Sequence, residues 1–283
     1  MSVHEEKQKG IEQMYFRGHT TVFASRTDPR FPYALFVPHR FDRIGPGRTR
    51  LLVAVHGTGR THLLYRDLFA EFADYHDCIV IAPLFPANVL GDGNLHGYKF
   101  IEESGIRYDR IMLGIIDEVA ERFGLAADRV LMFGFSGGAH FTHRFTILHP
   151  GRIEAASIAA PGSVTLLDPA RPWWTGIADV NERFGIRIAG HEYRNLALHF
   201  VVGTADLETW EITFNESDRY YMPGANDAGR TRIDRIRALA DSFRRAGARV
   251  RLDTVPGVAH DVAPLALHAR QFFHDVIAGD FDP

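Results

Sequence analysis

Short apolar runs alternate with helix-length amphipathic stretches along most of the chain, and this alternation is the strongest constraint on its fold. The runs are almost uninterrupted, as strands buried on both faces of a sheet require. They span residues 51–55, 78–82, 130–135, 153–160, 196–202 and 249–255. The stretches with helical spacing span residues 63–75, 108–123, 230–246 and 262–278, and a further helix follows residue 136 through about 148. Strands separated by helices in this way predict an α/β protein with a mostly parallel sheet and right-handed crossovers.

A hairpin near the start and two long insertions complete the expected organisation. Residues 20–25 and 33–38 flank a turn-rich link and predict an antiparallel hairpin. The segments 163–195 and 207–229 interrupt the alternation, and connections of this length often form lids or binding loops. The sequence therefore predicts one domain over residues 1–283, with helices on both faces of the sheet and a small cap formed by the two insertions.

The charge balance and the cysteine content exclude several classes of protein. With 32 basic and 35 acidic residues the net charge is −3, which lacks the basic excess expected of a nucleic-acid-binding protein. Cys78 is the only cysteine, so no internal disulfide can form, and its apolar neighbours predict an inert thiol in the core. The apolar runs are far shorter than the ~20 residues that cross a bilayer, and Met1–Lys9 does not resemble a signal peptide. We therefore expect a cytoplasmic protein with neither a membrane nor a nucleic-acid partner, while a homo-oligomer stays open.

The strongest chemical signal is the pentapeptide from Gly134 to Gly138, which fits the pattern G-x-S-x-G around Ser136. An expected strand ends just before the serine and an expected helix starts just after it. A sharp strand-to-helix turn strains the backbone of the central residue, and glycines on either side let the chain pass close to itself. The turn would present the Ser136 hydroxyl as a nucleophile above the edge of the sheet.

A nucleophilic serine needs a base and an acid that orients the base. His260 and Asp206 both follow expected strands, so they should lie at the same edge of the sheet as Ser136. Asp168 is the rival acid and Asp179 a weaker rival. Asp261 adjoins the histidine and is expected to cap the last helix.

A glycine-rich turn after the strand 51–55 supplies the fourth element of the expected site. There the backbone N–H of Thr58 would face the N–H of Gly137, and two such donors could hold an oxyanion. His56 is expected to shape this turn by local hydrogen bonding rather than to transfer protons.

The chain resembles the α/β-hydrolase superfamily, most of all its compact serine esterases and polyhydroxyalkanoate-depolymerase-like enzymes. The resemblance covers residues 20–278 and rests on the His-Gly turn at 56–57, the elbow at 134–138, Asp206 and His260, in the expected order. It implies an eight-stranded, mostly parallel sheet. The oxyanion turn departs from the HGGG pattern of many lipases and esterases and reads His-Gly-Thr-Gly.

The two insertions are rich in aromatic side chains, which predict a substrate pocket beneath a cap. Trp173, Trp174 and Trp210 are the candidates for lining it, and the alternative is that such rings form ordinary core. His140 and His143 have a spacing that suits a metal, but no third ligand is apparent, so no metal is expected. The arginines of 230–245 are expected to form a solvated helix face.

These features predict a serine hydrolase that cleaves carboxylic esters of small to medium size through an acyl-enzyme, with no cofactor. Amide, peptide or C–C bond hydrolysis on the same fold is the first alternative. The second is a hydrolase-like receptor that captures a small ligand with little turnover.

Overall fold

The computed structural model describes residues 3–283, and most of them belong to regular elements. The strands are β1 Gly18–Ala24, β2 Pro32–Val37, β3 Arg50–Val55, β4 Cys78–Pro83, β5 Glu102–Glu103, β6 Ile106–Arg107, β7 Val130–Phe135, β8 Ile153–Ala159, β9 Ala197–Gly203 and β10 Arg249–Val255. The helices are α1 Val3–Phe16, α2 Phe41–Ile44, α3 His62–Leu68, α4 Ala70–His76, α5 Tyr108–Phe123, α6 Gly137–Leu148, α7 Val180–Phe184, α8 Arg232–Arg245 and α9 Val262–Ala278.

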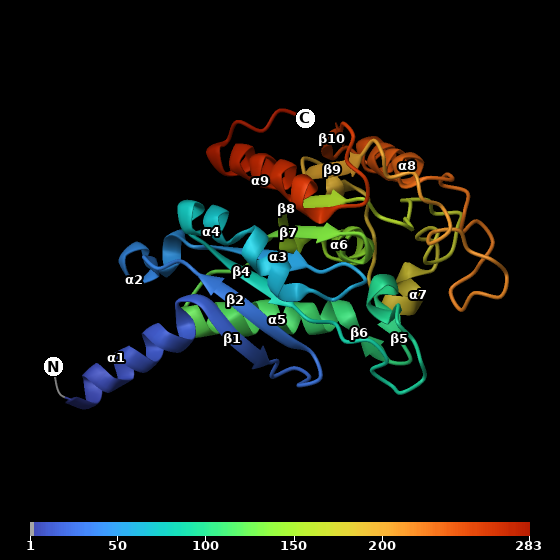
Figure 1. Cartoon of the computed structure of the whole chain (residues 1–283). Helices are drawn as coiled ribbons and strands as arrows, with labels where there is room; N and C mark the ends of the chain where they lie inside the picture. The colour runs from blue at the N-terminus through green and yellow to red at the C-terminus, as the bar shows by residue number, and fades with distance from the viewer. Residues whose placement is uncertain (1–2) are drawn as a thin grey trace.

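Eight of the strands form one sheet in the order β1-β2-β4-β3-β7-β8-β9-β10 (Figure 1). The hairpin β1–β2 is antiparallel and joins β4 in antiparallel fashion, whereas β4, β3, β7, β8, β9 and β10 are mutually parallel. The predictions of an eight-stranded, mostly parallel sheet and of an N-terminal hairpin are therefore confirmed. Because the parallel strands end in register, the loops after β3, β7, β9 and β10 meet at one edge.

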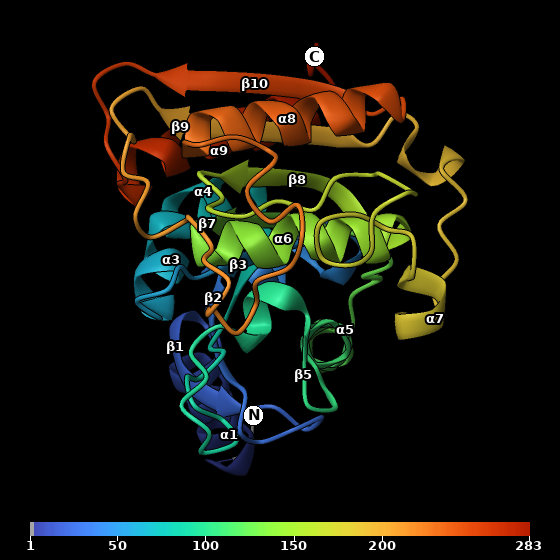
Figure 2. The ribbon, with the colours of Figure 1, turned by 90° about the vertical axis from the view of Figure 1, so that its right-hand side faces the viewer.

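Helices cover both faces of the sheet. Figure 2 shows α6 and α8 in front of the sheet, with α4 and α9 behind it. On the rear face the ring of Phe273 from α9 lies 6.3 Å from the rings of both Phe69 and Phe72. Cys78 is fully buried in β4, as predicted, and burial raises the pKa of its thiol to about 12.

One predicted helix is wrong, because the structure does not form it as a single continuous helix. The stretch 63–75 forms two helices, α3 and α4, which meet at Phe69 with backbone angles of φ −110° and ψ 1°. Phe69 is fully buried against Phe133 of β7, with 4.9 Å between ring centroids. The break thus accompanies packing of Phe69 into the core, which an amphipathic pattern alone does not reveal.

Helix α6 is buried along its whole length, because the sheet packs on one side and the insertions on the other. Figure 2 shows the second insertion, drawn in orange, crossing in front of α6. A third irregular segment, residues 84–107, also packs here through the 3₁₀ turn Gly97–Phe100, called η2. Among residues 3–283, no helix is both long and apolar enough to cross a bilayer.

Candidate active site

Ser136 stands between the end of β7 and the start of α6, in the strained backbone conformation expected of the central residue of a sharp turn. Its φ is 54° and its ψ is −115°, and its N–H donates to the carbonyl of Ala159 at 2.9 Å. A side chain at Gly134 would collide with the carbonyl of Gly138, and one at Gly138 would collide with the carbonyl of Val55. The missing side chains therefore let the turn pack directly against its own helix and against β3.

The structure brings Asp206 and His260 together from the loops after β9 and β10. His260 Nδ1 lies 2.6 Å from Oδ2 of Asp206, whose side chain is fully buried. The two loops are tied by a hydrogen bond from the N–H of Ala205 to the carbonyl of Val258 at 2.9 Å. The ring of Phe135 lies 4.6 Å from the imidazole of His260, and this contact helps to hold the imidazole at the edge of the sheet.

Arg232, at the start of α8, completes the surroundings of Asp206. Its Nη1 donates to Oδ1 of Asp206 at 3.0 Å and its Nη2 to Oε2 of Glu211 at 2.7 Å. Arg232 is only 2% exposed and Arg235 1%, so the expected solvated face is wrong for these two arginines. Their guanidinium groups are buried because carboxylate and carbonyl oxygens of the loops before α8 accept their hydrogen bonds.

Thr58 and Gly137 both line the space in front of Ser136. A Cβ added to Gly137 would lie 3.1 Å from Oγ1 of Thr58, so the two residues are in close contact. Gly137 also occupies the first position of α6, where N–H groups have no partner within the helix. The turn carrying Thr58 is supported by His56, whose Nε2 accepts from the N–H of Phe85 and whose Nδ1 donates to the carbonyl of Gly57. Burial lowers the pKa of His56 to about 3, so the imidazole is neutral.

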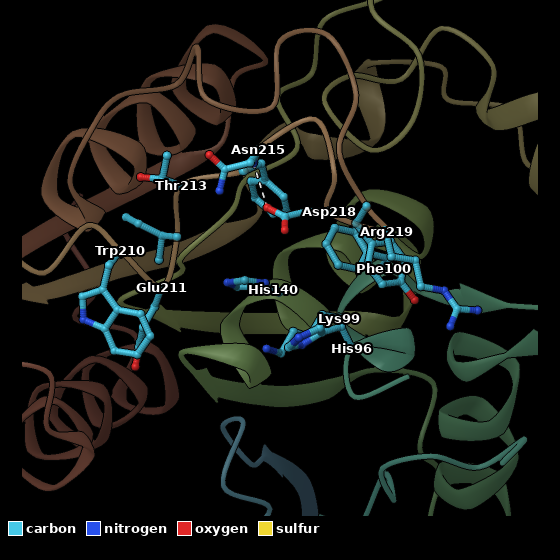
Figure 3. A pocket seen from close by; sticks show the side chains of 13 residues that line it. His96, Lys99, Phe100, His140, Trp210, Glu211, Thr213, Asn215, Asp218 and Arg219 are labelled. Atoms are coloured by element: carbon cyan, nitrogen blue, oxygen red, sulfur yellow. Dashed lines mark hydrogen bonds between the residues drawn. The ribbon is translucent and has the colours of Figure 1, made fainter. Parts of the chain in front are cut away.

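A cavity of about 450 Å³ opens in front of these groups. Ser136, Gly137, Thr58 and His260 all line it, and Arg232 forms part of its wall. A second cavity of about 370 Å³ shares several of its lining residues and extends beneath the second insertion. Figure 3 shows side chains from α6, from η2 and from the second insertion surrounding this second space.

The three tryptophans lie in different surroundings. Trp210 is 73% exposed and lines both cavities. Trp173 and Trp174 are buried, donate from their ring nitrogens to the carbonyls of Phe100 and Tyr220, and line neither cavity. Their place matches the alternative of ordinary core, in which they join the first insertion to η2 and to the second insertion.

The rival acids lie away from the imidazole of His260. Asp168 pairs with Arg171 in its own loop, and Asp179 accepts a hydrogen bond from the N–H of Trp173. Asp261 caps α9 by accepting from the N–H of Ala263 at 3.1 Å, as expected.

His140 and His143 use both ring nitrogens for structural hydrogen bonds. Nε2 of His140 accepts from the N–H groups of Gly162 and Ser163, and Nε2 of His143 accepts from the N–H of Thr165. Burial holds the pKa of both rings well below the usual range, so they are neutral. With these lone pairs occupied, the two histidines fasten the first insertion to α6.

A second serine–histidine–aspartate array crosses three neighbouring strands. Ser157 Oγ lies 2.9 Å from Nδ1 of His199, whose Nε2 lies 3.1 Å from Oδ2 of Asp253. Ser157 and His199 are fully buried within the sheet, so no substrate reaches them. Catalytic residue types alone therefore do not define a site, and access to a cavity separates Ser136 from Ser157.

Sequence reasoning missed Lys99 as well as Arg232. Lys99 belongs to η2, in an irregular segment without periodicity, and it lines both cavities. One signal could have found it, because the only other lysines in the chain are Lys7 and Lys9.

Several solved structures of other proteins are similar in fold to this chain. No protein-family model and no curated protein sequence matches the chain. Among solved structures, poly(aspartic acid) hydrolase-1 from Sphingomonas sp. KT-1 is 22% identical, with a TM-score of 0.67 over 85% of this chain and 92% of its own. A poly(3-hydroxybutyrate) depolymerase from Bordetella parapertussis is 20% identical, with a TM-score of 0.70 over 92% and 91%.

An S-formylglutathione hydrolase from Agrobacterium tumefaciens is 15% identical, with a TM-score of 0.57 over 91% of this chain and 93% of its own. All three similarities extend over most of both chains. Together with the strand order and the turn at Ser136, they show that this chain has the α/β-hydrolase fold.

Proposed function

We propose that the protein is a serine hydrolase that cleaves carboxylic esters through an acyl-enzyme. The observation that carries this proposal is the convergence of Ser136 and the Asp206–His260 pair on one cavity, with the serine in the strained turn. The similar structures named as a depolymerase of poly(3-hydroxybutyrate) and as an S-formylglutathione hydrolase support hydrolysis of acyl compounds.

In the proposed reaction, Ser136 Oγ attacks the ester carbonyl while Nε2 of His260 accepts the hydroxyl proton. The C–O bond to the alcohol then breaks, and His260 returns the proton to the leaving oxygen. Water next attacks the acyl-enzyme and gives a proton to His260. The bond between the acyl carbon and Ser136 Oγ then breaks, His260 returns the proton to Oγ, and the acid leaves. Asp206 keeps Nδ1 of His260 protonated and stabilises the transient imidazolium.

The N–H groups of Thr58 and Gly137 would hold the negative oxygen of each tetrahedral intermediate. Donors fixed in place before the reaction need no reorganisation, and removal of one such donor typically costs about 10²–10³ in rate. The two adjoining cavities are of a size that suits small or medium substrates rather than a bulky lipid. A cytoplasmic location stays a prediction.

A fluorophosphonate probe tests the assignment of the nucleophile. The wild-type protein should be labelled at Ser136 and should hydrolyse 4-nitrophenyl butyrate, whereas Ser136→Ala should lose both labelling and turnover while keeping the same melting temperature. Ser157→Ala is the matched control, because Ser157 also contacts a histidine but lies inside the sheet.

Full esterase activity in purified Ser136→Ala would refute the proposal. Weak labelling together with no turnover of activated esters would instead favour a ligand receptor. A panel of matched ester, thioester and amide substrates separates ester from amide hydrolysis.

A further inference from the structure

Lys99 is unusual for a buried residue in this protein. Of the 32 basic residues only three are lysines, and Lys99 is the only one beyond residue 9. Its side chain is 8% exposed, yet no hydrogen bond or ion pair forms at its Nζ within the part of the chain that the structure describes. The residue lines both cavities, and Figure 3 shows its side chain near His140 and His96.

An ammonium group in this position is costly for folding. Burial, with the nearby guanidinium groups of Arg60, Arg144 and Arg232 as lesser causes, lowers the pKa of Lys99 to about 8. Buried charges in proteins are normally paired, because an unpaired one loses its hydration without compensation. Nζ of Lys99 is not among the fully buried polar atoms that lack a partner in the described residues, so it opens to the cavity, where a bound anion can pair with it.

The surroundings of Lys99 are electropositive. Arg60 donates to the carbonyls of Phe85, Thr58 and Leu95, and Arg144 donates to hydroxyl and carbonyl oxygens. Neither guanidinium has a carboxylate partner among residues 3–283.

Arg232 is already neutralised by Asp206 and Glu211. Among the charged side chains that line the two cavities, Arg219 pairs with Asp92 and Arg232 with Glu211, while Asp218 forms no ion pair within the described part of the chain. Lys99 is thus the lining cation that has no carboxylate partner there. Its ammonium group, with the guanidinium groups of Arg60 and Arg144 nearby, can attract an anion that enters the cavity.

The position of Lys99 relative to Ser136 indicates which part of a substrate would meet it. Cε of Lys99 lies 2.9 Å from where a Cβ of Gly137 would be, so the lysine side chain lies against the residue that follows the nucleophile. The second cavity continues beyond Lys99 under the insertion. An acyl chain attached to Ser136 and directed into the second cavity would therefore pass the ammonium group.

We propose that Lys99 is a substrate-binding residue that selects esters whose acyl part carries a carboxylate a few carbons from the scissile bond. This inference rests on the proposed ester hydrolysis and names its substrate class: half-esters of dicarboxylic acids and related anionic acyl compounds. The carboxylate supplies the missing partner of Lys99 in a charge-assisted hydrogen bond, the stronger kind in a partly buried site.

Two substrates that differ only in charge test the proposal. Mono(4-nitrophenyl) glutarate carries a terminal carboxylate, and 4-nitrophenyl 5-methylhexanoate carries an isopropyl group of the same shape in its place. After correction for spontaneous hydrolysis, the wild-type kcat/KM should be at least tenfold higher for the glutarate. Lys99→Met should lower the ratio of the two kcat/KM values by 10–100-fold, mostly through KM.

Lys7→Met is the matched control, because Lys7 is exposed on α1, and it should keep the wild-type ratio. The melting temperature gives a second readout. Lys99→Met should raise it, because an unpaired buried charge is removed, whereas loss of a structural contact would lower it. A wild-type preference for the neutral ester would overturn the proposal. An equal loss of kcat/KM on both esters in Lys99→Met would also overturn it, because such a loss indicates that Lys99 contacts the oxyanion instead.

Binding to Ser136→Ala separates this inference from the proposed function. Isothermal titration with glutarate should show binding at pH 7 that is much weaker at pH 9.5, while 5-methylhexanoate should bind weakly at both values. If the wild type hydrolyses neither the glutarate half-ester nor the neutral ester, the proposed function fails even where glutarate binds. If neutral esters are hydrolysed but glutarate does not bind, only the role of Lys99 fails.

Discussion

Asp206 accepts hydrogen bonds from two cations or potential cations on opposite oxygens, with Arg232 at 3.0 Å from Oδ1 and His260 at 2.6 Å from Oδ2. The carboxylate is therefore fixed in its plane and points one lone pair at the imidazole. Arg232 would act on the reaction through its hydrogen bond to Asp206, so we assign it as a positioning residue.

Replacing Arg232 by Met should therefore lower kcat on a neutral ester by about 10-fold or more, with a smaller effect on KM. Breaking a buried ion pair typically costs about 3–5 kcal/mol, so the melting temperature should also fall. A variant that is less stable but keeps the wild-type kcat would show that Arg232 is merely structural.

The two aspartates proposed from the sequence differ in what they contact. Asp206→Asn should lower kcat by about 10⁴, because the amide favours the wrong tautomer of His260. Asp168→Asn should change kcat by less than twofold, since Asp168 pairs with Arg171 on a surface loop. The rate of 4-nitrophenyl butyrate hydrolysis by each variant is the measurement. A large loss of kcat in Asp168→Asn with little change in Asp206→Asn would identify Asp168 as the acid.

Gly137 has no room for a side chain. Gly137→Ala would place a methyl group against Tyr98, Lys99 and Thr58, so the backbone N–H must move out of line. We expect at least a 100-fold loss in kcat, as measured on a neutral ester. Gly151→Ala is the control, because a methyl group there meets no atom within 4 Å and should leave kcat unchanged. Equal losses in the two variants would point to general destabilisation.

Anionic esters should show a dependence on alkaline pH that neutral esters lack. Lys99 carries its charge below its lowered pKa of about 8 and loses it above, so kcat/KM for the glutarate half-ester should fall as pH rises through about 8. Arg60, Arg144 and Arg232 disfavour the ammonium, and Glu211 favours it. Profiles of the two ester substrates from pH 6 to 10 provide the measurement, and parallel profiles would contradict the prediction.

Replacing Trp210 should change substrate preference, whereas replacing Trp174 should change stability. Trp210→Ala should change relative kcat/KM across a series of ester chain lengths with little effect on the melting temperature, because Trp210 is exposed at the cavity. Trp174→Ala should destabilise the protein by about 3–5 kcal/mol, the usual cost of truncating a buried Trp. Thermal melts and the chain-length series test the pair, and a chain-length shift in a stable Trp174→Ala variant would contradict this division.

The mostly parallel sheet could be predicted because its strands are continuously apolar and its connections are helical. The same local logic located Ser136, since the glycines of its turn are required by close backbone packing, and it located Asp261 as the cap of α9. The catalytic roles of Ser136, Asp206 and His260 remain a proposal. It is supported by the position of all three residues in loops at one edge of the sheet.

The interior of the site could not be predicted in the same way. The burial of Arg232 and Arg235 depends on oxygen atoms from the loops before α8, and no helical pattern encodes such partners. The break at Phe69 depends on the ring of Phe133, far away in sequence. Lys99 lies in an irregular segment where periodicity carries no information.

Burial of the whole of α6 limits how substrates can reach Ser136. Arg235 joins the second insertion to the loop after β8 through the carbonyls of Gly162, Ile212 and Gly229. Swinging that insertion outward would break these bonds and expose buried polar side chains of α6, such as His140, to water. Trp210 is exposed and lines both cavities, so we expect substrate and product to pass beside it, and the width of the cavity there would set the upper size of the molecules that enter.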